Sequence, residues 1–533
     1  MIRRDFLRRG ATGALTALLP NPAQAQAATP APPQRGAGAV GIFDVRDFGA
    51  TGDGKTIDTQ AVDQAIAAAS SGGGGTVRFP AGAYACYTIH LKSHVTLYLD
   101  AGATIIAADV PPEGTMSGGY DPAGPPQAWE AYQDFGHNHW PNSLIYGEGL
   151  ENITICGPGL IWGKGLSRGE ASELPHAESP GVGNKAIALK NCRNVQIRDL
   201  SMLMCGHFAV LLTGVDNVLI DGLTIDTNRD GIDIDCCRNV RVTNCVVNSP
   251  WDDAICPKSS FALGYARATE NVTISNCYVT GQYDFGSLLN AKFTRATYSQ
   301  QRKALGRIKC GTESNGGFKN ITITNCIFEG CRGLALETVD GADIEDVTVS
   351  NLSMRGVVHP PFFLRLGARL RGPKGIVPGV LRRVLFSNIV SSGAVAQYPS
   401  IIAGIPGHLV EDLKFDNLYL QQAGGGTAEW AAIKPPEKVN AYPEADMFGI
   451  LPATGFFIRH ARNIELTNVE IATEAPDARP AIWAEDVDGL DVFRLRTRSS
   501  SPAFSLQNVR EFRTFGSRDL PDRKERAVSS LQF

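Results

Sequence analysis

The sequence predicts an all-β protein, a single-stranded, right-handed parallel β-helix with an N-terminal helical cap. A short pattern of asparagine followed by alternating apolar and polar residues recurs along the chain; Asn194 and Asn217 are 23 residues apart, and Asn217 and Asn239 are 22 apart. The alternation places the apolar side chains on one face of each extended segment. A unit this short cannot bury that face alone, so successive coils have to stack and pair with one another.

The repeat also separates this fold from two other repeating architectures. A leucine-rich repeat would show a regular leucine spacing and a helical half, and a β-propeller would need blades of about 40 residues.

Wider spacings between some copies predict loops inserted into particular coils, at about 108–145, 282–306 and 421–450, which are long enough to wall a cleft. The repeated segments are 151–155, 193–197, 216–220, 238–242, 270–274, 319–323 and 462–466.

The cap is predicted from a helical pattern that precedes the repeats. Ala61, Val62 and Ile66 recur at helix spacing within residues 59–70. A run of glycines at 72–75 ends the pattern before an apolar segment of strand character. We therefore expect one helix to cover the open end of the stack.

The first 25 residues have the composition of an export signal. Arg3 and Arg4 followed by x-Phe-Leu are typical of a twin-arginine signal, and Ala23-Gln24-Ala25 is a small-x-small cleavage site. Residues 26–40 are rich in Pro, Ala and Gly and are predicted to be a linker. The β-helix domain is expected over 41–533, and the mature protein in the periplasm or outside the cell.

Composition narrows the classes of partner. The formal net charge is −4, and removal of residues 1–25, with four arginines and one aspartate, makes it −7. An acidic chain has no long-range attraction for nucleic acid. No apolar run reaches 18 residues, so no membrane span is expected.

Several of the 12 cysteines follow the asparagine of a repeat, which predicts free thiols in the core. We expect a monomer.

Three carboxylates and two cations carry the chemistry. Asp230 and Asp253 are separated by 23 residues, the length of one coil, so Asp230 and the Asp252-Asp253 pair are expected to be neighbours. Three close carboxylates cannot all ionise at low cost, so one should have a raised pKa and the others can activate water. Arg307 and Lys309 share one face of a strand and are candidates to hold a substrate carboxylate.

Other interpretations of these residues remain open at this point. Asp233 and Asp235 lie close in sequence to Asp230, so the acidic cluster is also a candidate Ca²⁺ site or a solvated face. Arg307 and Lys309 are also compatible with a surface strand. Two histidine motifs are assigned structural parts: His137 and His139 in a loop packed on the coils, and His207 as a hydrogen-bonded core residue.

The three motifs together resemble the polygalacturonase-type pectinases, glycoside hydrolase family 28, over roughly residues 41–500. Asn228-Arg229-Asp230 corresponds to the family's Asn-Thr-Asp, Asp252-Asp253 to its Asp-Asp, and Arg307-Ile308-Lys309 to its Arg-Ile-Lys. The resemblance implies an inverting hydrolase with no cofactor and no metal. It implies Asp252 as general acid, with Asp230 and Asp253 holding the attacking water.

The resemblance also assigns the substrate contacts. It implies that Arg307 and Lys309 clamp the substrate carboxylate, and that Asn228 and Lys258 touch the sugar. The family's Gly-His-Gly is absent, because residues 281–286 read Gly-Gln-Tyr-Asp-Phe-Gly. Tyr283 or Asp284 is expected to replace that histidine. Tyr283 is also a stacking candidate for the sugar, beside Trp251 and Tyr298.

The leading hypothesis is a glycoside hydrolase of galacturonate-containing, pectin-type polysaccharide, with an acidic plant cell-wall polymer or its oligosaccharides as partner. The departure at the histidine position makes rhamnogalacturonan or another decorated uronate glycan a candidate beside plain polygalacturonan. The alternatives are a polysaccharide lyase or C5-epimerase acting on uronate glycans, and a non-catalytic glycan-binding β-helix.

Overall fold

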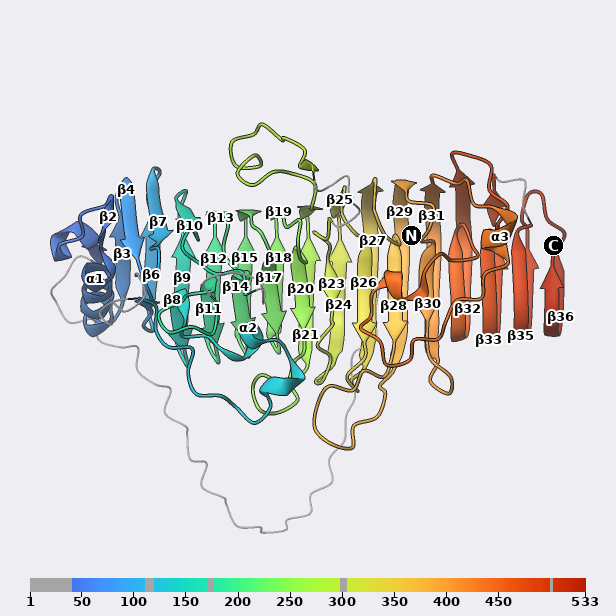
Figure 1. The fold of residues 1–533 in the computed structure, drawn as a ribbon, viewed down its shortest axis with the longest axis horizontal. Helices are drawn as coiled ribbons and strands as arrows, with labels where there is room; N and C mark the ends of the chain where they lie inside the picture. Colours follow the sequence, from blue (N-terminus) through green and yellow to red (C-terminus); the bar gives the residue numbers. More distant parts are fainter. Residues whose placement is uncertain (1–40, 111–118, 170–175, 298–303, 499–501) are drawn as a thin grey trace, which may run out of the picture. The chain divides into compact units, whose positions relative to one another are not determined.

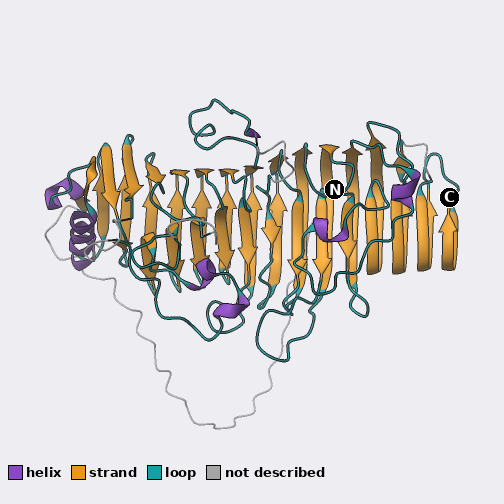
Figure 2. Ribbon diagram, in the orientation of Figure 1, coloured by secondary structure: helices purple, strands orange, loops and turns teal. Residues whose placement is uncertain are grey.

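The computed structural model describes residues 41–110, 119–169, 176–297, 304–498 and 502–533. The described chain winds into coils whose strands pair in parallel with the equivalent strands of the coils before and after. Figures 1 and 2 show these strands as a continuous ladder with loops projecting from it. The predicted parallel β-helix is confirmed. The predicted export signal and linker lie outside the described residues, as does Tyr298.

Three stacks of strands, parallel except for the last strand β36, form the walls of the coil. The first stack consists of β1 (Ile42–Asp44), β3 (Gly75–Phe79), β6 (Val95–Leu99), β9 (Glu151–Cys156), β12 (Arg193–Arg198), β15 (Asp216–Asp221), β18 (Arg238–Thr243), β21 (Thr269–Ser275), β24 (Phe318–Thr324), β27 (Ile344–Arg355), β29 (Leu381–Ala394), β31 (Val410–Gln422), β32 (Phe456–Thr473), β33 (Ile482–Phe493), β35 (Phe504–Phe515) and β36 (Arg523–Gln532).

The second stack has shorter strands and merges with the first at β27, which spans both walls. Its strands are β2 (Asp53–Ile57), β4 (Gly82–Cys86), β7 (Ala103–Ala107), β10 (Leu160–Trp162), β13 (Ser201–Leu203), β16 (Thr224–Asp226), β19 (Val246–Asn248), β22 (Tyr278–Thr280), β25 (Ile327–Glu329) and, paired with β32, β34 (Arg496–Thr497).

The third stack carries the candidate site. Its strands are β5 (Ile89–His90), β8 (Ser143–Glu148), β11 (Lys185–Lys190), β14 (Phe208–Thr213), β17 (Asp230–Asp235), β20 (Ile255–Lys258), β23 (Lys309–Cys310), β26 (Leu334–Thr338), β28 (Phe362–Leu366) and β30 (Ser400–Ala403). The helical segments are η1 (Val45–Phe48), α1 (Thr59–Ser71), η2 (Glu130–Tyr132), α2 (Phe135–Asn138), α3 (Ala428–Ala431) and η4 (Ala445–Phe448).

The repeated asparagine fixes the corner that leads into the first stack. Asn217, Asn239 and Asn271 all adopt left-handed backbone conformations, with φ of 56°, 57° and 57°. Asparagine tolerates this region better than most residues. The Asn239 amide donates to Asn217 Oδ1 at 3.1 Å and accepts from Asn271 at 3.0 Å. The repeat thus encodes both the corner and a ladder of amides between coils.

The interior of the coil is a continuous apolar core. Ile153, Val195, Val218 and Val240, at equivalent positions of successive coils, are buried. All twelve cysteines are buried and free, as the sequence predicted. A chain with this many cysteines would suggest disulfides, but here the thiols pack in the core as small apolar side chains.

The two ends of the stack differ. The predicted cap helix is confirmed as α1, which packs its buried Ala61, Val62 and Ile66 against the first coils (Figure 1). At the far end β36 reverses direction and pairs antiparallel with β35. Within the described part of the chain, no helix has the length and apolar character needed to cross a membrane.

Candidate functional site

The three predicted catalytic aspartates lie together on the third stack. Ile232 of β17 pairs with Ile255 of β20, which places Asp230 and Asp253 at the same position of successive coils. The Asp253 backbone N–H donates to Asp230 Oδ1 at 3.2 Å and to Asp252 Oδ1 at 3.1 Å. The one-coil spacing therefore brings all three carboxyl groups to one point, as predicted.

Asp253 is held as an anion by two buried cations. Its side chain is fully buried, and its oxygens lie 2.8 Å from Arg307 Nε and 2.5 Å from Lys309 Nζ. Burial alone would raise the pKa of Asp253, but the charges of Lys309 and Arg307 outweigh it and hold the pKa below the usual range. This carboxyl group is consequently ionised at any pH of interest.

Asp230 has the opposite electrostatic environment. It is 2% exposed, and burial together with repulsion by Asp233 and Asp252 raises its pKa well above the usual range, against the attraction of Lys258. Asp230 is thus the carboxyl group with the raised pKa that the sequence predicted for this cluster.

Asp252 is the most accessible of the three. Its side chain is 19% exposed, and Arg229 grips its Oδ2 with Nε at 3.1 Å and Nη2 at 2.8 Å. Arg229 is itself steadied by the carbonyl of Arg168, which accepts from Nη1 at 3.0 Å. The sequence placed Arg229 within a motif but gave it no role, because the resemblance offers threonine at this position.

The two predicted substrate clamps face protein carboxylates. The side chains of Arg307 and Lys309 are 2% and 3% exposed. Besides Asp253, Arg307 contacts Glu444 through Nη2 at 2.5 Å and Nη1 at 3.4 Å, and Glu337 lies 3.7 Å away. Glu444 is delivered by the insert predicted at 421–450. The interpretation of both cations as a surface strand is wrong, and their role as substrate clamps stays a prediction.

The other predicted contact residues are placed as follows. Lys258 is buried between Asp233 at 3.5 Å and Glu313 at 3.6 Å. Asn228 is 4% exposed, next to Asp230 in the chain. Tyr283 is 8% exposed; its backbone bonds to the Asn248 side chain and its hydroxyl lies 3.3 Å from that of Tyr278. Their roles toward substrate stay predictions.

A histidine does stand beside the carboxylates, but it comes from another coil. One ring nitrogen of His207 and one oxygen each of Asp230 and Asp252 all lie within 4.8 Å of one another. His207 is 3% exposed, and neither ring nitrogen has a hydrogen-bond partner among the residues that the structure describes. The expectation of a hydrogen-bonded structural histidine is therefore wrong. Burial, and next the charge of Arg229, lowers the pKa of His207 well below its usual value.

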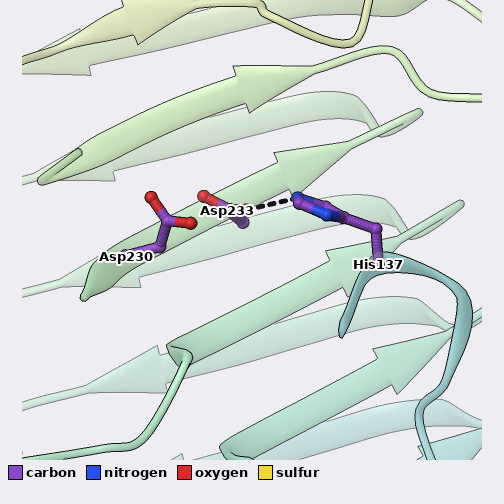
Figure 3. A group of neighbouring side chains, drawn as sticks. All are labelled: His137, Asp230 and Asp233. Carbon is purple, nitrogen blue, oxygen red and sulfur yellow. Dashed lines mark ion pairs between the residues drawn. The ribbon is translucent and has the colours of Figure 1, made fainter. Parts of the chain in front are cut away.

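A second group of neighbouring ligand-type side chains adjoins the first. Figure 3 shows Asp233 between Asp230 and His137, whose Nε2 lies 3.6 Å from Asp233 Oδ2. Asp235 does not join this group, because its oxygens accept from Ser260 N at 2.8 Å and Oγ at 2.6 Å. Calcium prefers six to eight oxygens. Lys258 already supplies positive charge to Asp233, so the donor set suits an internal ion pair better than Ca²⁺.

Comparisons with known proteins agree with this fold. A family model described as rhamnogalacturonase A/epimerase, pectate lyase-like, matches residues 42–137, and a model of the right-handed β-helix region matches residues 176–300. A probable polygalacturonase of Vitis vinifera is 26% identical over 56% of this chain and 61% of its own length. The plasmin and fibronectin-binding protein A of Streptococcus pneumoniae is 31% identical over 46% of this chain and 32% of its own.

A solved structure extends the likeness to nearly the whole chain. The exopolygalacturonase of Thermotoga maritima superposes with a TM-score of 0.52 over 92% of this chain and 95% of that one, at 18% identity, which bears on the fold. The matched region spans between about a third and three-fifths of the two sequence relatives. The resemblance to polygalacturonase-type pectinases is confirmed.

Proposed function

We propose that this chain is an exported glycoside hydrolase that cleaves glycosidic bonds in galacturonate-containing, pectin-type polysaccharide with inversion at the anomeric carbon. The observation that carries the proposal is the contrast among three adjoining carboxyl groups. Asp253 is locked as an anion by Arg307 and Lys309, Asp230 has a raised pKa, and Asp252 is the one with substantial exposure. Glycoside hydrolysis needs such a division between a proton donor and an anion.

The Asp230–Asp252 pair supplies the proton. Asp230 is the member whose pKa is raised, and Arg229 holds the carboxyl group of Asp252. The two groups have oxygens within 4.8 Å of each other, so the pair can redistribute one proton. Asp252 is the member that meets the glycosidic oxygen, because its side chain is exposed while Asp230 is buried.

Asp253 supplies fixed negative charge for the water and the developing cationic ring. The two cations keep Asp253 ionised, so the base for the attacking water is Asp230, whose own proton has passed through Asp252 to the leaving oxygen. The water gives its hydroxyl to the anomeric carbon and its proton to Asp230, which restores the starting protonation of the pair. Its backbone N–H, directed at Asp230 and Asp252, fixes the geometry of the triad.

The test is digestion of polygalacturonan, rhamnogalacturonan and xylogalacturonan by the wild type and by D252N. Reducing ends and near-ultraviolet absorbance are followed together, with and without a chelator. D199N is the matched control, because Asp199 has a 57% exposed side chain outside the cluster. New reducing ends without absorbance, lost in D252N and retained in D199N, are expected, and proton NMR of the first product reports the anomer.

Two other results would replace the proposal. Absorbance that needs a divalent ion would indicate a lyase. Binding of a polymer without turnover would indicate a glycan-binding protein. Product size over time separates release from chain ends from internal cleavage; the insert that reaches the site with Glu444 favours release from ends.

A further inference from the structure

Glu444 occupies the position on Arg307 at which a substrate carboxylate would be expected. Its two oxygens face Nη1 and Nη2 of the guanidinium, the paired geometry in which arginine binds a carboxylate. Arg332 contacts the same carboxylate through Nη1. With Asp253 on Nε, the three nitrogens of Arg307 all face protein carboxylates.

The segment that carries Glu444 is firmly seated. Glu444 directly precedes η4, whose Ala445 and Phe448 are 1% and 3% exposed. Phe448 packs in a cluster with Phe457, at 5.9 Å between ring centroids, and the Arg365 guanidinium lies 5.4 Å from its ring. Displacing this segment would therefore separate Glu444 from the buried Arg307 and unpack a hydrophobic cluster, each of which is costly.

Among the residues that the structure describes, the neighbouring cations also lie beside protein carboxylates. Arg229 faces Asp252, Lys309 faces Asp253, and Lys258 lies between Asp233 and Glu313. A uronate ring entering this site would bring a negative charge to cations that already have partners, and it would meet Glu444 itself. Such a repulsive element is a recognised means of excluding one ligand in favour of another.

We propose that Glu444 is a specificity-determining residue and that the ring bound beside Arg307, at the bond that breaks, is a neutral sugar without a carboxylate. This inference rests on the proposed hydrolase function and narrows its substrate. Galacturonate units of the polymer then bind at a distance from the reacting ring. Glu444 acts through Arg307: its own carboxylate fills the anion position, so that Arg307 serves Asp253 and not the substrate.

The experiment compares galacturonate with galactose, which differ by the carboxylate, as ligands of the wild type, E444A and E444Q. D446N is the matched control, because Asp446 lies two residues away in the same segment, with a 59% exposed side chain that accepts from the Tyr398 hydroxyl at 2.6 Å. Calorimetric titration measures binding without requiring turnover. Retention of the wild-type melting temperature shows that each variant is folded.

The expected result is weak galacturonate binding by the wild type and D446N, with affinity at least tenfold higher in E444A and partly higher in E444Q. Galactose affinity should stay within twofold in every variant. In digestion, KM for oligogalacturonides should fall in E444A, while kcat on a polymer with a neutral ring at the cleaved bond is retained.

Two results would overturn the inference. One is tight galacturonate binding by the wild type that E444A leaves unchanged or weakens; the other is rapid wild-type hydrolysis between two galacturonate rings. Either leaves the hydrolase proposal standing. The hydrolase proposal fails separately, if no polymer yields new reducing ends that are lost in the D252N variant. In that case the calorimetric titration still decides the role of Glu444.

Discussion

Arg229 reaches across one coil to Asp252 and binds a single carboxylate oxygen with two nitrogens, at 3.1 Å and 2.8 Å. The contact orients the exposed member of the triad. We predict that R229K, which keeps the charge but loses the planar fork, lowers kcat by roughly tenfold to a hundredfold with little change in KM. Steady-state kinetics check this, and an unchanged kcat would mean that Asp252 is oriented by other contacts.

The pH dependence of the rate should report the proton held by Asp230. Because the pKa of Asp230 is raised, the proton is present at low pH and activity falls as pH rises through that pKa. Asp233 contributes to the shift by repulsion. In D233N the alkaline limb of kcat/KM should therefore move to lower pH. A limb that stays in place would show that another group carries the proton.

His207 should stay uncharged throughout the working range of the enzyme. Burial and the nearby charge of Arg229 lower its pKa well below the usual value, so protonation occurs only at pH well below that of a free histidine. The ring nitrogen chemical shifts of labelled protein between pH 5 and 8 should be those of neutral imidazole. H207Q is expected to lower kcat more than it lowers the melting temperature, because the ring lies beside Asp230 and Asp252. Loss of stability without a selective loss of kcat would return His207 to a structural role.

His90 should link the cap to the first coils in a pH-dependent way. Its ring nitrogens lie 2.8 Å from Asp121 and 2.7 Å from Asp63 of α1, and these carboxylates raise its pKa to about 10. A pKa raised above the unfolded value of about 6.5 gives stability that is full below that pH and lost as pH rises toward 10. The melting temperature of the wild type should exceed that of H90Q at pH 6, and the difference should vanish near pH 10. A difference that is constant with pH would exclude a charged His90.

The asparagine ladder should contribute measurably to stability despite its exposure. N239A removes two amide hydrogen bonds and places alanine at a φ of 57°, so a loss of about 1–2 kcal/mol is expected. R241A, on the same strand and also exposed, should change the unfolding free energy by less than about 0.5 kcal/mol. Equal effects of the two changes in denaturant titration would argue against the ladder.

The sequence was sufficient for features that follow the period of the coil. The spacing of Asn194, Asn217 and Asn239 predicted the stack of coils. The same one-coil spacing predicted that Asp230 and Asp253 are neighbours. His207 was accessible to this arithmetic as well, since Phe208, the next residue, pairs with Asp230. The sequence analysis gave His207 a structural role instead, because the family's histidine motif corresponds to the region around Tyr283.

Contacts made by inserts could not be predicted in this way. Glu444 lies 137 residues from Arg307 along the chain, in a segment without a repeat, so no periodicity connects the two. The same holds for Arg229 and the Arg168 carbonyl, whose contact depends on the path of a loop. Burial of Arg307 and Lys309 follows from these loops, and a motif of two cations on a strand carries no information about what covers it.

The antiparallel strand β36 opposes end-to-end association of two β-helices. A stack of similar coils presents, at its last coil, a row of backbone groups on which an equivalent coil of a second molecule could continue the ladder. By running antiparallel to β35, β36 interrupts the direction in which coils propagate. Its exposed residues include Lys524 and Arg526, charges that oppose edge-to-edge pairing. With α1 over the first coils, both ends of the ladder are protected against growth into fibres.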